Sequence, residues 1–145
     1  ADPTGAAIGL WQPNSHPGAD VVNEPGSYCW SELLTSDLDA ATAFYAAILG
    51  WEARASDGPM PYTEFQVGGR SIAGMMARPR MMPAEVPNHW GVYFAVADLD
   101  AAVARVGELG GSAFMGTIDT PAGRVAPVMD PTGASLNLIQ LAPQH

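Results

Sequence analysis

The pentapeptide Asp37-Leu38-Asp39-Ala40-Ala41 recurs in the second half of the chain as Asp98-Leu99-Asp100-Ala101-Ala102. A Leu-Gly pair follows each copy, at 49–50 and at 109–110, and an apolar run with aromatic residues precedes each. A five-residue match alone can arise by chance in an Ala-rich chain. Because the flanking pattern matches as well, the sequence indicates an internal duplication.

Each copy predicts a strand, a helix and three further strands. Asp37 and Asp98 are placed to cap helices, because an Asp side chain accepts hydrogen bonds from the free N–H groups of a first helical turn. Apolar residues follow at helical spacing, and Gly50 ends the first helix. The expected elements are a strand at 28–35, a helix between Asp37 and Gly50, strands at 51–56, 62–67 and 71–77, then a strand at 89–96, a helix at 98–109, and strands at 112–119, 125–129 and 134–141.

This order predicts an α+β domain of two βαβββ modules. In such a module the helix covers one face of the sheet, and the other face must be buried by something else. We therefore expect the two sheets to curl around a shared concave space, a half-barrel in which a small ligand would sit.

A second repeat has a longer period. Asp2-Pro3-Thr4-Gly5-Ala6 returns before the last apolar run of the chain as Asp130-Pro131-Thr132-Gly133-Ala134, and the first copy is followed by an apolar run as well. The run at 8–11 predicts an extra N-terminal strand, and residues 12–26, with three Pro and two Gly, are typical of a linker. We therefore assign residues 1–26 to the remnant of a preceding copy. The domain itself is expected at 27–145, with modules at about 27–80 and 88–143.

Composition limits the partners and the compartment. The 145 residues carry a net charge of −9, with 15 acids against six bases, all Arg. Such a chain repels nucleic acid and anionic membranes, so neither is expected as a partner. The single cysteine, Cys29, cannot form an intrachain disulfide, and no continuous apolar stretch is long enough to cross a membrane. These features predict a cytoplasmic protein in which Cys29 is an inert, buried thiol.

The helix signature resembles that of a known superfamily. Phe44-Tyr45 and Leu49-Gly50-Trp51 follow a strand and a capping Asp, and Asp130–Ala134 precedes the last strand. In these motifs the chain resembles the vicinal oxygen chelate superfamily of glyoxalases, bleomycin-resistance proteins and extradiol dioxygenases. Within it, the chain is similar to the C-terminal domain of tandem glyoxalase-like actinobacterial proteins. The resemblance implies a small organic ligand and either a homodimer or a tandem partner domain.

The superfamily's enzymes hold a divalent metal with His, Gln or Glu from the first and last strands of each module. Counting from the capping Asp and from the last Asp-Pro turn, the corresponding positions here are Trp30, Gly91 and Asn137, with 73–75 in the first module. Trp and Gly supply no ligand for a hard cation, and Asn supplies only a neutral oxygen. We therefore expect no cofactor. The predicted function is a glyoxalase- or bleomycin-resistance-like protein that binds a small molecule for detoxification or resistance.

Residues two positions from Trp30 or Gly91 lie on the same strand face as these expected ligand positions, because side chains alternate along a strand. These candidates for catalysis are Glu32, His89 and Tyr93. Glu32 would act as a general base if burial raises its pKa, or it faces solvent or an Arg. His89 would be a base or a metal ligand, or it bonds to the loop at 86–88. Tyr93 would donate a hydrogen bond to a ligand, or it is part of the core.

Four further residues are candidates for ligand contact. Trp30 and Met75 would supply apolar surface, although core filling explains Met75 equally well. Asn137 would orient a polar group, and Arg124 would meet an anion, although a surface role for Arg124 is also open. The alternative function is a lyase, isomerase or dioxygenase of the same superfamily that uses Glu32 and His89, with or without a divalent metal ion. The loop between Arg78 and Asn88 is a candidate lid.

Overall fold

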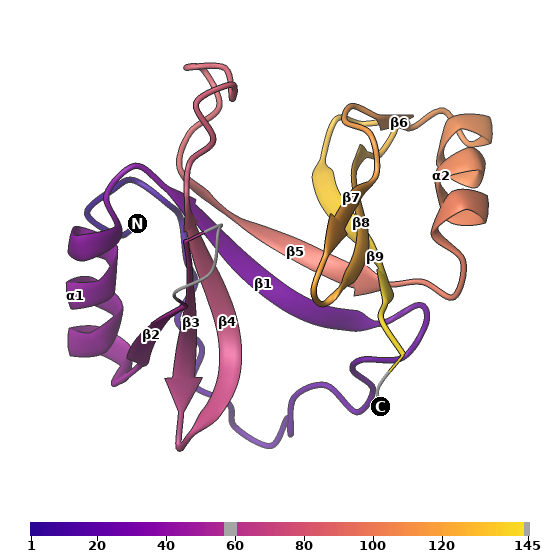
Figure 1. Ribbon diagram of the computed structural model, residues 1–145. Coiled ribbons are helices and arrows are strands. Elements are labelled where there is room, and N and C mark those ends of the chain that lie inside the picture. The colour runs from indigo at the N-terminus through magenta and orange to yellow at the C-terminus, as the bar shows by residue number, and fades with distance from the viewer. Residues whose placement is uncertain (57–60, 144–145) are drawn as a thin grey trace. The chain divides into compact units, whose positions relative to one another are not determined.

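A computed structural model describes residues 1–56 and 61–143 of the chain (Figure 1). The predicted end of the domain at residue 145 lies outside these described residues. The chain forms two compact units. Unit 1 is Ala1–Gln12 with Trp30–Gly91, and unit 2 is Pro13–Cys29 with Val92–His145. The elements in order are β1 (Tyr28–Thr35), α1 (Leu38–Leu49), β2 (Glu52–Ser56), β3 (Tyr62–Val67), β4 (Arg70–Ala77), β5 (His89–Ala95), α2 (Leu99–Glu108), β6 (Ser112–Ala113), β7 (Ile118–Thr120), β8 (Gly123–Met129) and β9 (Ser135–Leu141).

The sheet of unit 1 has the order β2-β3-β4-β1. β2, β3 and β4 form an antiparallel meander, and β4 pairs in parallel with β1. α1 packs on one face of this sheet, where its buried Ala41 and Tyr45 meet Leu33, Phe65 and Met75 (Figure 1). This face holds the core of the unit.

The sheet of unit 2 repeats that arrangement with the order β5-β9-β8-β6. β8 and β9 are antiparallel, and β9 pairs in parallel with β5. α2 covers one face, where Leu99 meets Ala126, Val128 and Leu138. The two βαβββ modules predicted from the sequence are therefore confirmed.

The helix caps explain why both helices begin where they do. The side chain of Asp37 accepts from the backbone N–H of Ala40 at 2.9 Å, and that of Asp98 accepts from Ala101 at 3.0 Å. Both capping residues have extended backbones, which is the usual N-cap conformation. Gly50 ends α1 with φ 67°, a left-handed conformation that favours glycine. None of the helices in the described residues is both long and apolar enough to cross a membrane.

The strand expected at 112–119 is split into β6 and β7. Ala113 pairs with Val128 and Ile118 pairs with Val125, so four residues on one side oppose only Ala126 and Pro127 on β8. The ladder cannot continue in register across unequal lengths, and Pro127 has no backbone N–H to donate. The prediction of one continuous strand is therefore wrong.

The extra N-terminal strand predicted at 8–11 is also absent, since residues 7–13 belong to no strand or helix. Ala6 is fully buried in the core of unit 1 and Ile8 packs against it, but Leu10 and Trp11 are 70% and 64% exposed. The apolar run is thus not the inner face of a strand. Its first residues fill a gap in the core, and its last residues point outward.

The two Asp-Pro-Thr-Gly-Ala segments form the same turn. In each, one carboxylate oxygen of the Asp accepts from the Thr N–H at 2.8 Å, from the Thr hydroxyl, and from the Ala N–H at 3.0 Å. The backbone N–H of the Asp also donates to the Ala carbonyl at 2.9 Å in both. The sequence repeat is therefore a structural repeat.

Candidate functional site

One polar cluster lies on the sheet face of unit 1 opposite α1. Leu33, Phe65 and Ala73 face the helix, so their neighbours along each strand face the other way. Strand pairing aligns Glu64 of β3 with Gly74 of β4, and Gly74 with Glu32 of β1. We call this surface the Glu32 face. It comprises Trp30, Glu32, Tyr62, Glu64 and Gly74.

Tyr62 lies directly over Gly74. A Cβ atom at position 74 would be 1.7 Å from the Tyr62 hydroxyl oxygen, 2.4 Å from its Cζ, and 3.0 Å from Trp30 Nε1. Any side chain larger than hydrogen at position 74 would therefore displace Tyr62.

Three polar groups form a directed chain on this face. Trp30 Nε1 donates to the Tyr62 hydroxyl at 2.9 Å. Burial raises the pKa of Tyr62 well above its ordinary value, and the charge of Glu32, together with a hydrogen bond to Glu32, raises that pKa further. Tyr62 is therefore a neutral phenol that donates to Glu32. Glu32 and Trp30 are both half-buried.

Behind this face, the core of unit 1 contains a second chain of polar groups. Trp90 Nε1 donates to the Tyr45 hydroxyl at 2.8 Å, and that hydroxyl donates to Asp2 Oδ2 at 2.8 Å. Burial raises the pKa of Tyr45 to about 12, and Asp2 adds to that rise. Burial opposes ionisation of Asp2, but hydrogen bonds from Thr4, Tyr45 and Ala6 offset it and hold its pKa below the usual value. This second chain anchors the N-terminal turn.

The predicted ligand contact Met75 lies in the core. It is 1% exposed and packs in the cluster with Leu33 and Tyr45, on the helix side of the sheet. Its neighbour Met76, which pairs with Leu34, is on the opposite side of β4 and is half-buried. Met75 is therefore part of the core, and the methionine on the Glu32 side of β4 is Met76.

His89 takes up the loop contact that was one of its two interpretations. Its Nδ1 lies 2.8 Å from the carbonyl oxygen of Pro87. A carbonyl only accepts, so Nδ1 is the donor of this contact.

Tyr93 and Asn137 lie together in unit 2, as register partners on β5 and β9. Asn137 Nδ2 donates to the Val92 carbonyl at 3.4 Å, which ties it to the neighbouring strand. The thiol of Cys29 lies 3.5 Å from the Tyr93 carbonyl oxygen, and burial raises the pKa of that thiol. Cys29 is half-buried, not fully buried as predicted, and the raised pKa favours its protonated form.

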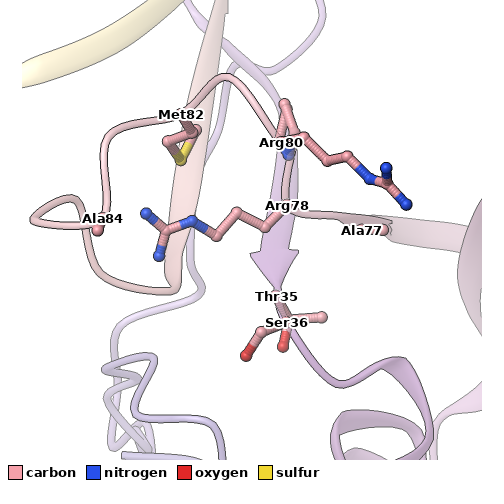
Figure 2. Close-up of a pocket in the computed structure, with 8 residues that line it drawn as sticks. Thr35, Ser36, Ala77, Arg78, Arg80, Met82 and Ala84 are labelled. Atoms are coloured by element: carbon pink, nitrogen blue, oxygen red, sulfur yellow. The ribbon is translucent and has the colours of Figure 1, made fainter.

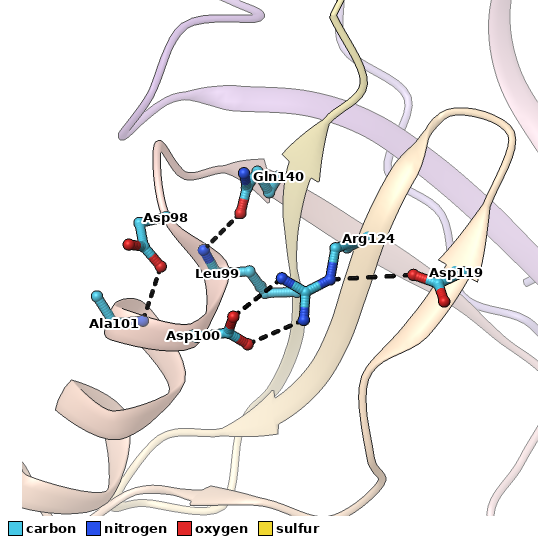
Figure 3. A network of polar contacts seen from close by, with 7 residues as sticks. All are labelled: Asp98, Leu99, Asp100, Ala101, Asp119, Arg124 and Gln140. Atoms are coloured by element: carbon cyan, nitrogen blue, oxygen red, sulfur yellow. Dashed lines mark hydrogen bonds and ion pairs between the residues drawn. The ribbon is translucent and has the colours of Figure 1, made fainter.

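Arg124 holds α2 to β8 (Figure 3). Its Nη1 and Nη2 donate to the two carboxylate oxygens of Asp100 at 3.0 and 2.9 Å, and its Nε lies 3.9 Å from Asp119. Hydrogen bonds and charge from Arg124 hold the pKa of Asp100 below its usual range. The guanidinium that was a candidate anion contact is engaged by carboxylates of its own unit.

An open depression of about 470 Å³ lies where β1 and β4 end in unit 1. The loop over it is held by turns, and the backbone N–H of Arg78 donates to the Thr35 carbonyl at 2.8 Å. Figure 2 shows that the guanidinium groups of Arg78 and Arg80 point in opposite directions. They do not converge on one anion.

Among the described residues, those at the superfamily's metal-ligand positions do not fit a divalent metal. Trp30, Gly91 and Asn137 stand at the positions where the ligands are expected. Across residues 1–56 and 61–143, no group of three or more His, Cys, Asp or Glu side chains is arranged to hold a metal ion. Glu32 and His89, the alternative ligands, belong to no such group.

Sequence reasoning missed Tyr62 and Gly74. Tyr62 was placed correctly in a strand, but its contact with Trp30 spans 32 positions of sequence. The signal that was available is Gly74 itself, because a glycine inside a strand often marks the close approach of another group.

Comparison with known proteins agrees with this fold. The sequence profile of the family described as "Glyoxalase-like domain" matches residues 30–139. The chain is 44% identical over 147 residues to "Putative glyoxylase CFP32" of Mycobacterium tuberculosis, covering 99% of this chain and 55% of that protein. It is 41% identical over 143 residues to "Anthracycline biosynthesis protein DnrV" of Streptomyces peucetius, covering 97% of this chain and 51% of that protein. The chain thus spans about half the length of these relatives.

Solved structures share the architecture at low sequence identity. Methylmalonyl-CoA epimerase from Mycobacterium tuberculosis matches with a TM-score of 0.59 and 19% identity, over 80% of this chain and 88% of that one. The hypothetical protein BH1468 from Bacillus halodurans matches with a TM-score of 0.62 and 12% identity, over 82% of this chain and 96% of that one. At these identities the likeness concerns the fold alone.

Proposed function

Because the chain belongs to the glyoxalase-like domain family, we propose that it binds a small organic molecule on the Glu32 face, without the metal that the superfamily's enzymes use. The observation that carries this proposal is the group of Trp30, Tyr62 and Glu32 over Gly74. Trp30 and Tyr62 supply aromatic surface, and Glu32 supplies one hydrogen-bond acceptor. Small-molecule sites usually have this composition, mostly apolar with a few polar groups.

The residues at the metal positions support the absence of a metal. Trp30 stands where the resemblance places a ligand, and a tryptophan side chain there offers stacking surface and no ligand atom. Two relatives have names that refer to small-molecule chemistry, a glyoxylase and an anthracycline biosynthesis protein. The proposed role of the binding is detoxification or resistance.

The test is calorimetric titration of the full chain with fused-ring aromatic compounds, one of them an anthracycline, with and without EDTA. We expect binding that EDTA does not change. Trp30→Ala should weaken it about fivefold or more, since an aromatic contact contributes about 1 kcal/mol or more. The matched control is Trp11→Ala, an exposed tryptophan of the same unit. Equal affinity in the Trp30 variant, or binding that requires a divalent ion, would contradict the proposal.

A second candidate function is a superfamily lyase or isomerase that uses Glu32 and His89. The observation that favours it is the Pro87 contact of His89, which engages Nδ1 and orients the ring so that Nε2 is the nitrogen directed away from that contact. Turnover of a methylglyoxal–glutathione adduct that disappears in both Glu32→Gln and His89→Gln would select this function over simple binding. Association with a second copy or a tandem domain stays a prediction.

A further inference from the structure

The hydrogen-bond chain on the Glu32 face has only one possible polarity. An indole N–H can only donate, so the Tyr62 oxygen is the acceptor of the bond from Trp30. Since Trp30 Nε1 donates to the oxygen of Tyr62 at 2.9 Å, the hydroxyl hydrogen of Tyr62 is directed to Glu32. The order is therefore indole to phenol to carboxylate.

The position of Tyr62 depends on the missing side chain at Gly74. The hydroxyl oxygen lies 1.7 Å from where a Cβ would stand, so the phenol occupies space that only glycine leaves. Gly74 is also the register partner of Glu32 on the neighbouring strand. The missing side chain at Gly74 thus allows the phenol of Tyr62 to lie beside the carboxylate of Glu32.

This arrangement determines the chemical character of Glu32. A carboxylate accepts at about four lone-pair positions, and the bond from Tyr62 uses one of them. The Tyr62 hydroxyl thus presents Glu32 as a hydrogen-bond acceptor, and Glu64 lies in the same cross-strand row.

We propose that Tyr62 is a positioning residue that fixes Glu32 as an acceptor, and that the ligand is a flat apolar ring system that presents a phenol or enol hydroxyl to Glu32. This inference rests on the proposed function, because it names the ligand class of the same site. A ligand with a carboxylate at that point would face Glu32 and Glu64, and a ligand with only ether or carbonyl oxygens would have no hydrogen to give.

The test uses two probes that differ in one hydrogen-bond donor, 2-naphthol and 2-methoxynaphthalene, titrated calorimetrically into the full chain at pH 7. We expect 2-naphthol to bind at least about tenfold more tightly, the range for a hydrogen bond to a charged group. Tyr62→Phe should weaken the binding of 2-naphthol and leave the affinity for 2-methoxynaphthalene unchanged. The preference for 2-naphthol should therefore fall to less than about threefold. Tyr28→Phe, which removes an exposed phenol, is the matched control.

Two further variants keep the proposal open to contradiction if Tyr62→Phe folds poorly. Glu32→Gln should also abolish the preference for 2-naphthol, and Gly74→Ala should weaken both probes by displacing Tyr62. A structural role alone would weaken both probes equally in Tyr62→Phe, and that outcome overturns the inference. Equal binding of both probes to the unaltered chain would overturn the inference and leave the proposed function standing. Failure of both probes to bind would count against both.

Discussion

The two modules have the same strand pairing but carry different side chains at equivalent positions. In unit 1 the cross-strand row is Glu64, Gly74 and Glu32, and in unit 2 the corresponding row is Pro127, Asn137 and Tyr93. Both rows lie opposite the helix, and Glu32 and Tyr93 occupy equivalent positions in the two copies of the sequence repeat. Duplication therefore preserved strand register, while the chemistry of the row diverged. Only the row of unit 1 combines a carboxylate with the close approach of a phenol.

The cores differ in the same way. Tyr45 is at the centre of an aromatic cluster in unit 1, with ring centroids of Phe44, Trp51, Phe65 and Trp90 at 5.2 to 5.6 Å from its own. Unit 2 is built on aliphatic side chains, with Leu99, Val128 and Leu138 at its centre. The same module fold can therefore be stabilised by an aromatic core or by an aliphatic core, provided that the side chains fill it.

Among substitutions that test the difference between the two cores, we expect Tyr45→Ala to destabilise the protein most. The side chain is fully buried and bonds to both Asp2 and Trp90, so its loss leaves a cavity and two groups without their partner. We expect a loss of about 3–5 kcal/mol in the free energy of unfolding, measured by urea denaturation. All four tryptophans lie in unit 1, so their fluorescence reports on that unit.

The matched change in unit 2 is Val106→Ala, at the position of the second copy that corresponds to Tyr45 in the first. Val106 is only partly buried, and its truncation should lower the free energy of unfolding by roughly 1 kcal/mol, followed by circular dichroism. Equal losses in the two variants would show that the aromatic cluster is no more demanding than the aliphatic one.

Substitution of the Asp in the two Asp-Pro-Thr-Gly-Ala turns should have a smaller effect on stability, and one that differs between the turns. Asp2 is 5% exposed and accepts from Tyr45, so Asp2→Ala should cost roughly 2–3 kcal/mol of unfolding free energy. Asp130 makes the same turn at a more exposed position, and Asp130→Ala should cost less. Identical losses would mean that the turn itself, and not its burial against Tyr45, provides the stability.

The pH dependence of the same pair sharpens the contrast. Because the pKa of folded Asp2 lies below the unfolded value of about 3.9, its contribution is fully present above about pH 5 and is lost as the pH falls through the folded pKa. The difference between the unaltered chain and Asp2→Ala should therefore be constant from pH 5 to 7 and shrink below about pH 4. A difference that grew on acidification would have the wrong sign.

The smallest effect belongs to the arginines that follow a glycine in each module, Arg70 and Arg124. Arg124 bonds to the carboxylate of Asp100, but both groups are exposed to solvent. Ion pairs of this kind contribute little, so Arg124→Ala should change the midpoint of urea denaturation only slightly, and less at high salt. Arg70→Ala, the counterpart in unit 1, serves as the control. A large salt-independent loss in the Arg124 variant would give that residue a role beyond holding α2 to β8.

Local chemistry made much of the fold predictable. Asp37 and Asp98 cap the helices as their side chains require, and Gly50 ends α1 in the conformation that glycine favours. The fold class followed from the repeat of these signals. The N-terminal strand at 8–11 was wrong because an apolar run does not specify a hydrogen-bonding partner, and the split between β6 and β7 depended on unequal lengths opposite Pro127.

The site was less predictable, because it depends on register. Alternation placed Trp30 and Glu32 on one face, which strand pairing supports. Met75 lies in the core, which was one of its two interpretations, and Met76 lies on the opposite side of β4, because in a strand one residue exchanges the two faces. Tyr62 reaches Trp30 only because β3, β4 and β1 are neighbours in that order, and no local pattern encodes the order of strands in a sheet.

The burial of Asp2 has a consequence for the earliest part of the chain. Through Tyr45 and Trp90, the first six residues are connected to a helix and a strand that lie far away in the sequence. A protease that cuts near Gln12 would act on a short exposed peptide, yet the folded unit would lose an internal carboxylate and a buried alanine with it. Retention of the cleaved peptide by the rest of the chain, through Asp2 and Ala6, is therefore a direct gauge of how well unit 1 is folded.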